Sequence, residues 1–410
     1  MPSITTDAAF ALKATDVLRA HPFRRWFFGD SIGFEGLLAS DRLTGTRHGR
    51  DFVHGFLRGW AADPQPWQAL DFTAPGRILV DIALEEDDAI LRDVAVALAR
   101  HLDARRRVRG ATITFEDSGW CLRAPYSGTV LSPDDQALMQ DPGPGVWLDC
   151  MHFDAPFFAA MHRLDQHSGW AEKAVAELLA YRDLLLDPGT GLYCHFWLER
   201  PAHAFVRGWG RGQGWALLGL IDVAASCPAD TPRYDEIKSE IERLSHAMLR
   251  WQQPDGHWWC LAHDPRSGPE TSTAAFMATA FFRALRLGLL PRSNFEGPAQ
   301  HALDAVRREM DDTGVLRGVS AAVYAALIED HYWHVPLDLV VPWGQGPALT
   351  AMAEAAPWWC QTNANSSPFA QTRSASGYTE LTQPGESGGA VGLENGSAGE
   401  GALRVEPVVD

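Results

Sequence analysis

Two aspartates stand where buried helical runs are about to begin. Asp149 lies in WLDCMHFD, and Asp71 lies in LDFTAPGRIL, ahead of a proline that suits the first turn of a helix. An apolar wall such as Trp147 raises the pKa of a carboxyl group, and a second carboxyl group nearby raises it further. If the fold brings the two together, they can act as general acid and base near neutral pH.

Each aspartate also has a simpler interpretation. Asp149 could be a first-turn charge that complements the helix dipole, and Asp71 could be a helix cap. The sequence alone leaves both interpretations open.

The segment WGRGQGW adds a cation and aromatic rings. Arg211 and Trp215 are four residues apart and share one helix face, and Trp209 precedes them. Its glycines are unfavourable in a helix, which indicates the close approach of a ligand or another backbone. Arg211 fits an anion clamp or a donor to sugar hydroxyls. Alternatively, it is a buried arginine that pairs with an acid.

Aromatic and imidazole side chains complete the set of candidate binding residues. The chain has 16 tryptophans, and Trp26, Trp147, Trp209 and Trp215 stand beside glycines or acids at helix starts, where flat indole faces suit sugar rings. His195, in GLYCHFW, is predicted to lie in a loop at the same place. The chain has no HExxH motif or CxxC pair, so we expect no metal site.

These residues sit on a repeating arrangement of helices. Six apolar segments, each with polar residues at its start, alternate with six amphipathic ones. The apolar segments are 26–40, 71–84, 146–163, 209–223, 269–283 and 343–355, and the amphipathic ones are 8–20, 49–62, 87–104, 170–186, 233–252 and 294–310. This pattern predicts an all-α fold in which six helical hairpins close into an (α/α)6 barrel. An open solenoid would expose apolar surface.

In such a barrel the inner helices all begin at one mouth. Their free N–H groups and positive dipole ends favour a small anionic ligand there, although the formal net charge is −17. That charge argues against nucleic acid or an anionic membrane as a partner. No apolar run is long enough to span a membrane, and the N-terminus lacks a secretory signal, so we expect a cytoplasmic protein.

The domain organisation follows from a change in composition near residue 360. Residues 1–360 are predicted to form the catalytic barrel domain. Residues 361–410 are rich in Ser, Gly, Asn, Gln and Glu, and are predicted to be a disordered tail. The longest connection inside the barrel, 105–145, leads directly to Trp147 and Asp149, so we expect it to form a rim or lid.

With its motifs in order, the sequence resembles the unsaturated uronyl hydrolases of glycoside hydrolase families 88 and 105, and especially the unsaturated rhamnogalacturonyl hydrolases of the second. The resemblance covers residues 20–357. The segments that carry it are WFFGDSIGFEGLL, LDFTAPGRILVDIAL, VWLDCMHFDAPFFA, LLDPGTGLYCHFW, WGRGQGWALLGLIDV, PETSTAAFMATA and WGQGPALTAMAE. The third and fifth are the most specific.

The resemblance implies a cofactor-free hydration of the C4=C5 double bond in a terminal unsaturated uronic acid, which then leaves its oligosaccharide. It implies that Asp149 is the acid/base residue and that Asp71 is the second aspartate. It also implies that His195, Arg211 and Trp215 contact the ligand. The expected partner is a small oligosaccharide, and the protein is expected to be a monomer or homodimer.

Three departures and two alternatives bear on this interpretation. Gln213 stands where the family has asparagine, and Cys150 and His152 after the acid are unexpected. A sugar epimerase or a glucuronidase-like enzyme could use the same barrel. Epimerases of this type rely on paired histidines, and here only His195 is well placed. The other alternative is a sugar-binding protein without catalytic activity.

Overall fold

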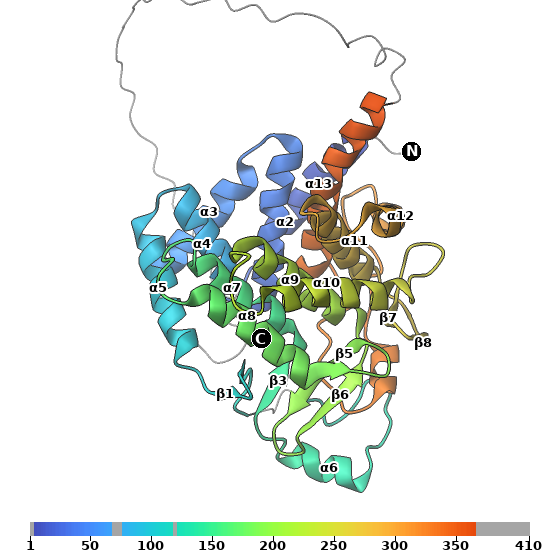
Figure 1. Ribbon diagram of the computed structural model, residues 1–410. Coiled ribbons are helices and arrows are strands. Elements are labelled where there is room, and N and C mark those ends of the chain that lie inside the picture. Colours follow the sequence, from blue (N-terminus) through green and yellow to red (C-terminus); the bar gives the residue numbers. More distant parts are fainter. Residues whose placement is uncertain (1–3, 68–75, 118–120, 366–410) are drawn as a thin grey trace, which may run out of the picture. The chain divides into compact units, whose positions relative to one another are not determined.

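The computed structural model describes residues 4–67, 76–117 and 121–365 (Figure 1). The chain divides into a compact unit, Met1–Asn363, and a second unit, Ala364–Asp410. Residues 361–365 of the predicted tail continue a helix. The remainder of that tail, like Asp71, lies outside the described residues.

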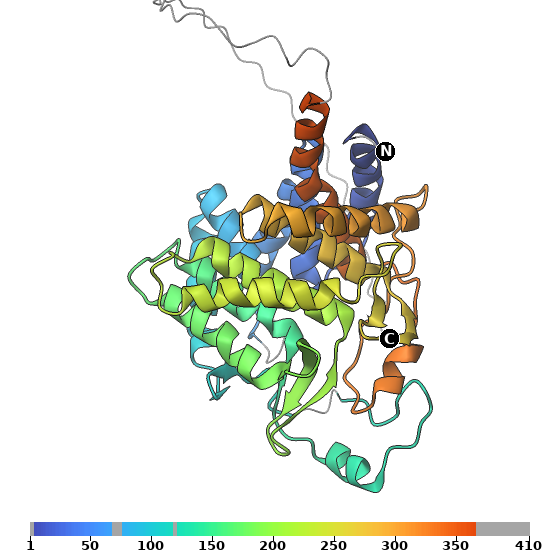
Figure 2. The same ribbon diagram turned by 45° about the vertical axis from the view of Figure 1, so that its right-hand side comes forward.

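Inner and outer helices alternate along the chain, as the apolar pattern predicts. The inner helices are α2 (Phe28–Thr44), α4 (Gly76–Glu85), α7 (Asp154–Met161), α9 (Gly210–Ser226), α11 (Thr271–Arg286) and α13 (Pro342–Asn365). The outer helices are α1 (Ile4–Arg19), α3 (His48–Ala62), α5 (Ala89–Asp103), α8 (Trp170–Leu185), α10 (Tyr234–Leu249) and α12 (Arg292–Glu309). The prediction of an (α/α)6 barrel is confirmed (Figure 2).

Burial separates the two sets of helices. Helix α11 is buried from Thr271 to Leu285, whereas α5 buries only a stripe of leucines and alanines. A helix buried all round must be enclosed by its neighbours, and a half-buried helix covers it from one side. None of the helices in the described part of the chain combines the length and apolar character that a membrane-spanning helix needs.

The ring closes where the last inner helix meets the first. A Cβ atom added at Gly36 of α2 would lie 2.5 Å from the Cα of Gly346 on α13, and one added at Gly346 would strike the Ile32 carbonyl oxygen. Helix α13 also contacts α11, since the Thr279 hydroxyl donates to the Pro347 carbonyl at 3.0 Å. Glycines are therefore required at this seam because any side chain would push the backbones apart.

Short strands lie next to the starts of several inner helices. The central one, β5 (Leu192–Leu198), pairs with β3 (Gly145–Trp147), β4 (Leu186–Asp187) and β6 (His203–Arg207), all antiparallel. Strands β7 (Trp259–Leu261) and β8 (Asp264–Pro269) form a separate hairpin that leads into α11. The predicted loop around His195 is therefore wrong. The residue lies in β5, whose seven residues are all buried.

The long connection 105–145 contains the hairpin of β1 (Arg107–Val108) and β2 (Ala111–Thr112) and the helix α6 (Pro133–Gln140). It binds to the segment that connects α12 with α13. The Leu122 amide donates to the Ala325 carbonyl at 2.7 Å, and the Tyr126 amide donates to His331 Nδ1 at 3.1 Å. The connection therefore buttresses the 3-10 helix η3 (Glu329–His334).

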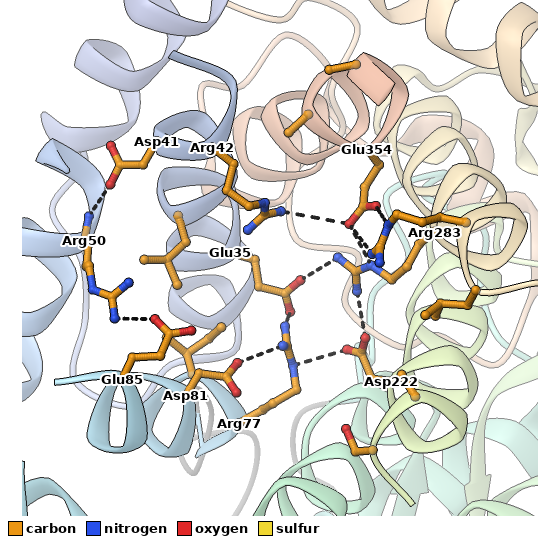
Figure 3. A pocket seen from close by; sticks show the side chains of 18 of the residues that line it. Glu35, Asp41, Arg42, Arg50, Arg77, Asp81, Glu85, Asp222, Arg283 and Glu354 are labelled. Carbon is orange, nitrogen blue, oxygen red and sulfur yellow. Dashed lines mark hydrogen bonds and ion pairs between the residues drawn. The ribbon is translucent and has the colours of Figure 1, made fainter. Parts of the chain in front are cut away.

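A cavity of about 1100 Å³ lies at the end of the barrel where the inner helices finish, and Figure 3 shows its lining. Seven arginines and six carboxylates line it. Each arginine is ion-paired within the protein; Arg283, for example, contacts Asp222, Glu35 and Glu354 at 2.8, 3.3 and 3.4 Å. These pairs link α11 to α9, α2 and α13, so they connect inner helices across the barrel.

We predict that Arg283→Met lowers the free energy of unfolding by about 3–5 kcal/mol, because it removes one of the two guanidinium groups that neutralise the buried carboxylates of Glu35 and Asp222. Arg286→Met is the matched control. Arg286 pairs with Glu354 as well, but its side chain is 46% exposed, so the expected loss is about 1 kcal/mol or less. Denaturant unfolding measures both. Equal losses in the two variants would contradict the prediction.

Candidate functional site

Asp149 lies in a one-turn 3-10 helix, η2 (Leu148–His152), between strand β3 and helix α7. Its side chain is 15% exposed, whereas its neighbours Leu148 and Cys150 are buried. Trp147 ends β3, and its ring packs on Phe115 and Phe196 with centroid distances of 4.5 and 5.1 Å. Asp149 is thus a partly exposed polar residue between two buried neighbours.

His195 reaches Asp149 because β5 pairs with β3. In that ladder Trp147 lies opposite Phe196, so His195 is next to the end of β3. The distance from His195 Nε2 to Asp149 Oδ2 is 3.8 Å. The Trp209 ring packs on the imidazole with a centroid distance of 4.3 Å. Trp209, the residue before α9, therefore contacts His195, which faces Asp149.

Arg211 is buried in the first turn of α9 and bound from several sides. It donates to Ser272 Oγ at 3.0 Å, Ser320 Oγ at 2.5 Å and the Ala321 carbonyl at 2.8 Å, and it pairs with Glu270 at 3.4 Å. Its guanidinium lies 5.0 Å from the Trp209 ring centroid. The geometry favours the simpler interpretation left open for Arg211, a buried arginine paired with an acid.

Glu270, the carboxylate that pairs with Arg211, is itself fixed by several hydrogen bonds. It caps α11 by accepting from the amides of Ser272 and Thr273, and it also accepts from the Ser320 amide at 3.0 Å. The charge of Arg211 and these hydrogen bonds outweigh burial and lower the pKa of Glu270. One ion pair therefore joins the starts of α9 and α11 to the segment that precedes α13.

The electrostatics give Asp149 and His195 different roles. Burial raises the pKa of Asp149 to about 6, although its own backbone amide and the charge of Arg211 act in the opposite direction. Burial lowers the pKa of His195 to about 3, with further contributions from His331 and Arg211. At neutral pH the site therefore contains a carboxyl group that exchanges a proton readily and an imidazole that stays neutral.

The structure places the other candidate residues elsewhere or does not describe them. Trp215 has no exposed surface and lies deeper in the barrel, against His152 and Phe276. Trp26 packs on Trp60 with a centroid distance of 5.0 Å. Asp71 lies outside the described residues, so its pairing with Asp149 stays a prediction. Asp149, His195, Trp209 and Arg211 are brought together, with Trp147 beside them.

The sequence analysis missed Tyr332, whose hydroxyl lies 2.5 Å from His195 Nδ1. Tyr332 belongs to η3, 137 residues away in the chain, and no motif surrounds it. It is 1% exposed. A conspicuous run of aromatic residues and histidines, DHYWH, was the available signal, but only the folded chain shows which ring reaches the site.

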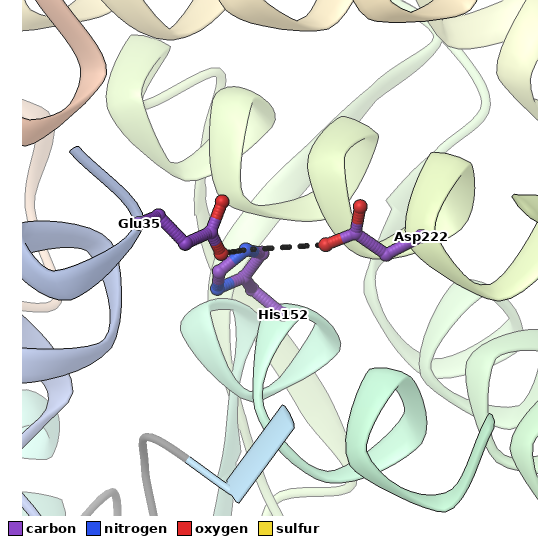
Figure 4. Close-up of side chains that lie close together, drawn as sticks. All are labelled: Glu35, His152 and Asp222. Carbon is purple, nitrogen blue, oxygen red and sulfur yellow. Dashed lines mark ion pairs between the residues drawn. The ribbon is translucent and has the colours of Figure 1, made fainter. Parts of the chain in front are cut away.

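Figure 4 shows the cluster in the described residues that comes nearest to a metal site: Glu35, His152 and Asp222, with ligand atoms within 4.8 Å of one another. Arg77 already contacts the same oxygen atoms of Glu35 and Asp222. Arg283 contacts the other oxygens of both carboxylates. Two guanidinium groups thus neutralise the carboxylates, and the donor set does not suit a metal ion.

Comparison with known proteins agrees with this geometry. Residues 9–358 match the model of Glycosyl Hydrolase Family 88, and the chain belongs to that family. The unsaturated rhamnogalacturonyl hydrolase YesR of Bacillus subtilis is 27% identical over 211 residues, which are 51% of this chain and 59% of that protein. The match thus spans about three fifths of the relative's length. Family membership does not favour the epimerase or non-catalytic alternatives.

Solved structures share the fold. A possible GH105 member from Salmonella enterica has a TM-score of 0.75 at 19% identity, covering 88% of this chain and 96% of that one. An unsaturated glucuronyl hydrolase from Bacillus sp. GL1, described as responsible for glycosaminoglycan degradation, has a TM-score of 0.61 at 17% identity, covering 85% and 95%. At these identities the likeness establishes the helical barrel.

The raised pKa of Asp149 predicts a cost in stability. A carboxyl group whose pKa is higher in the folded than in the unfolded chain binds its proton more tightly when folded, so stability falls as pH rises from about 4 through about 6. An asparagine at this position cannot ionise. We therefore expect Asp149→Asn to be more stable than the wild type by about 1–3 kcal/mol at neutral pH.

Chemical unfolding at about pH 5 and about pH 7.5 measures this difference, which should grow with pH. Asp230→Asn, at an exposed position, is the control and should show no such trend. A wild type that is as stable as Asp149→Asn at the higher pH would contradict the prediction.

Proposed function

We propose that the protein is a glycoside hydrolase that releases a terminal 4,5-unsaturated uronic acid from oligosaccharides left by a polysaccharide lyase. The observation that carries the proposal is Asp149, a carboxyl group with a pKa of about 6 that faces His195 and the charge of Arg211. Family membership and the similarity to YesR support the same reaction class.

Asp149 can supply both proton transfers of the reaction. Its carboxyl group donates a proton to C4 of the double bond, and the resulting carboxylate takes a proton from the water that attacks C5. The product is a hemiketal, which opens and releases the sugar on the other side of the glycosidic bond. The proton given to C4 is thus replaced from water, and Asp149 returns to its starting state.

The substrate is proposed to be a small fragment of the pectin or rhamnogalacturonan type. The similarity to the unsaturated rhamnogalacturonyl hydrolase of Bacillus subtilis supports this substrate class. The unsaturated glucuronyl hydrolase of similar fold makes glycosaminoglycan fragments the next class to test. We also propose a cytoplasmic monomer or homodimer that uses no cofactor. Five cysteines, Cys121, Cys150, Cys194, Cys227 and Cys260, are buried thiols that form no disulfide, which fits a reducing compartment.

Turnover of lyase products tests the proposal directly. The double bond conjugated with the carboxylate absorbs in the ultraviolet, so hydration appears as a loss of that absorbance. We expect loss with lyase-cut rhamnogalacturonan, and at least about a thousandfold decrease in kcat for Asp149→Asn, because the amide cannot donate the proton. Pectin, glycosaminoglycan and ulvan fragments form the comparison panel. No turnover of any member would refute the function.

The same chemistry predicts a pH dependence. The first step needs protonated Asp149, so kcat/KM should fall as pH rises through about 6 and then decrease about tenfold per unit. Initial rates on one unsaturated substrate, measured from about pH 5 to about pH 8, give the profile. A flat profile over that range would show that another group donates the proton.

A further inference from the structure

Tyr332 is tied to His195 by a hydrogen bond whose direction can be assigned. The Tyr332 oxygen lies 2.5 Å from His195 Nδ1. Burial raises the pKa of the Tyr332 hydroxyl, and a hydrogen bond with the Ala326 backbone opposes that rise. An interaction with that effect is a donated one, so the Ala326 amide donates to the Tyr332 oxygen. The hydroxyl hydrogen of Tyr332 is therefore free to point at His195.

Burial limits the acceptors that the hydroxyl hydrogen of Tyr332 can reach. Tyr332 is 1% exposed, so its hydroxyl cannot donate to bulk water, and an unpaired buried donor is costly. Among the described residues, His195 Nδ1 lies within hydrogen-bond distance and can accept this hydrogen. A neutral imidazole has one protonated and one unprotonated nitrogen. If Nδ1 accepts, the proton of His195 must be on Nε2.

The other side of the ring favours the same tautomer. His195 Nε2 faces Asp149 Oδ2 at 3.8 Å. With the proton on Nε2, a donor faces the carboxylate; with the proton on Nδ1, two acceptors would face each other and the tyrosine hydrogen would lose its partner. The separation exceeds a hydrogen-bond length, so Nε2–H is also available to an oxygen atom between the two groups.

We propose that Tyr332 is a positioning residue that holds His195 in the Nε2–H tautomer, so that His195 serves as a fixed hydrogen-bond donor beside Asp149. This inference deepens the proposed function and rests on it for its catalytic consequence. When Asp149 has given its proton to C4, Nε2–H stabilises the carboxylate and orients the oxygen that lies against it. His195 cannot accept a proton at Nε2, so His195 does not compete with Asp149 as the base of the reaction.

Nuclear magnetic resonance tests the tautomer without any substrate. In the full-length protein labelled with 15N-histidine, long-range 1H–15N correlations distinguish an Nε2–H from an Nδ1–H imidazole. The signal that is missing from His195→Gln identifies His195. We expect the Nε2–H pattern in the wild type and a mixture of tautomers in Tyr332→Phe. An Nδ1–H pattern in the wild type would overturn the proposal, whatever the substrate proves to be.

Kinetics then test the consequence for catalysis. Tyr332→Phe keeps the ring and removes the hydroxyl, and we expect kcat to fall at least about tenfold while KM changes less than about threefold. Tyr324→Phe is the matched control. It removes a half-exposed hydroxyl from the same connecting segment and should keep wild-type kinetics.

A double-mutant cycle separates positioning from simple loss of packing. A glutamine at position 195 can donate from an amide near the Nε2 position and has no tautomers to select. Tyr332→Phe should therefore reduce kcat less than about threefold in the His195→Gln background. Equal effects in both backgrounds would mean that Tyr332 acts independently of His195, and unchanged kcat in the single variant would also refute the proposal.

These outcomes are distinct from a failure of the proposed function. If the wild type turns over no unsaturated uronide, the function is wrong while the resonance experiment still decides the tautomer. If the wild type is active but Tyr332→Phe has the same kcat as Tyr324→Phe, the proposed function is supported and the positioning role of Tyr332 is refuted.

Discussion

The buried ion pair between Arg211 and Glu270 organises the end of the barrel where the inner helices begin. Glu270 caps α11, and Arg211 stands in the first turn of α9 and binds Ser320 and the Ala321 carbonyl. Either buried charge alone would be strongly destabilising, so the ion pair fixes the starts of α9 and α11 relative to each other. Trp209 packs between this pair and His195, and thereby connects the framework to the side chain that faces Asp149.

The two ends of the barrel use charge in opposite ways. Around the wide cavity, arginines and carboxylates neutralise one another. Arg42, Arg283 and Arg286 stand in the last turns of α2 and α11, where they complement the negative ends of the helix dipoles. Where the inner helices begin, the part of the chain that the structure describes places no arginine or lysine in an ion pair with Asp149, and burial raises its pKa into the range of a useful acid. Buried ion pairs thus stabilise both ends of the barrel, whereas the acid group Asp149 lies at the end where the inner helices begin.

The helical repeat was predictable because burial imposes a period on each helix separately. An inner helix must be apolar on all sides and an outer helix on one side, and both patterns can be read locally. The sequence predicted a loop around His195, whereas this segment is the central strand β5. Its strand structure depends on β3 and β6, which pair with it from other parts of the chain. Trp215 shares a helix face with Arg211 in the sequence, yet one turn along the helix moves it into the core.

The sequence by itself determined the barrel, its six inner helices, and the residue types available at their starts, because helix period and helix capping are local properties of the chain. Tertiary structure decided which of those residues face one another. Arg211 is bound by Glu270, and the His195 tautomer is selected by Tyr332, because both contacts join segments far apart in the chain. Spacing along a chain cannot predict such contacts, since they exist only after the ring of helices has closed.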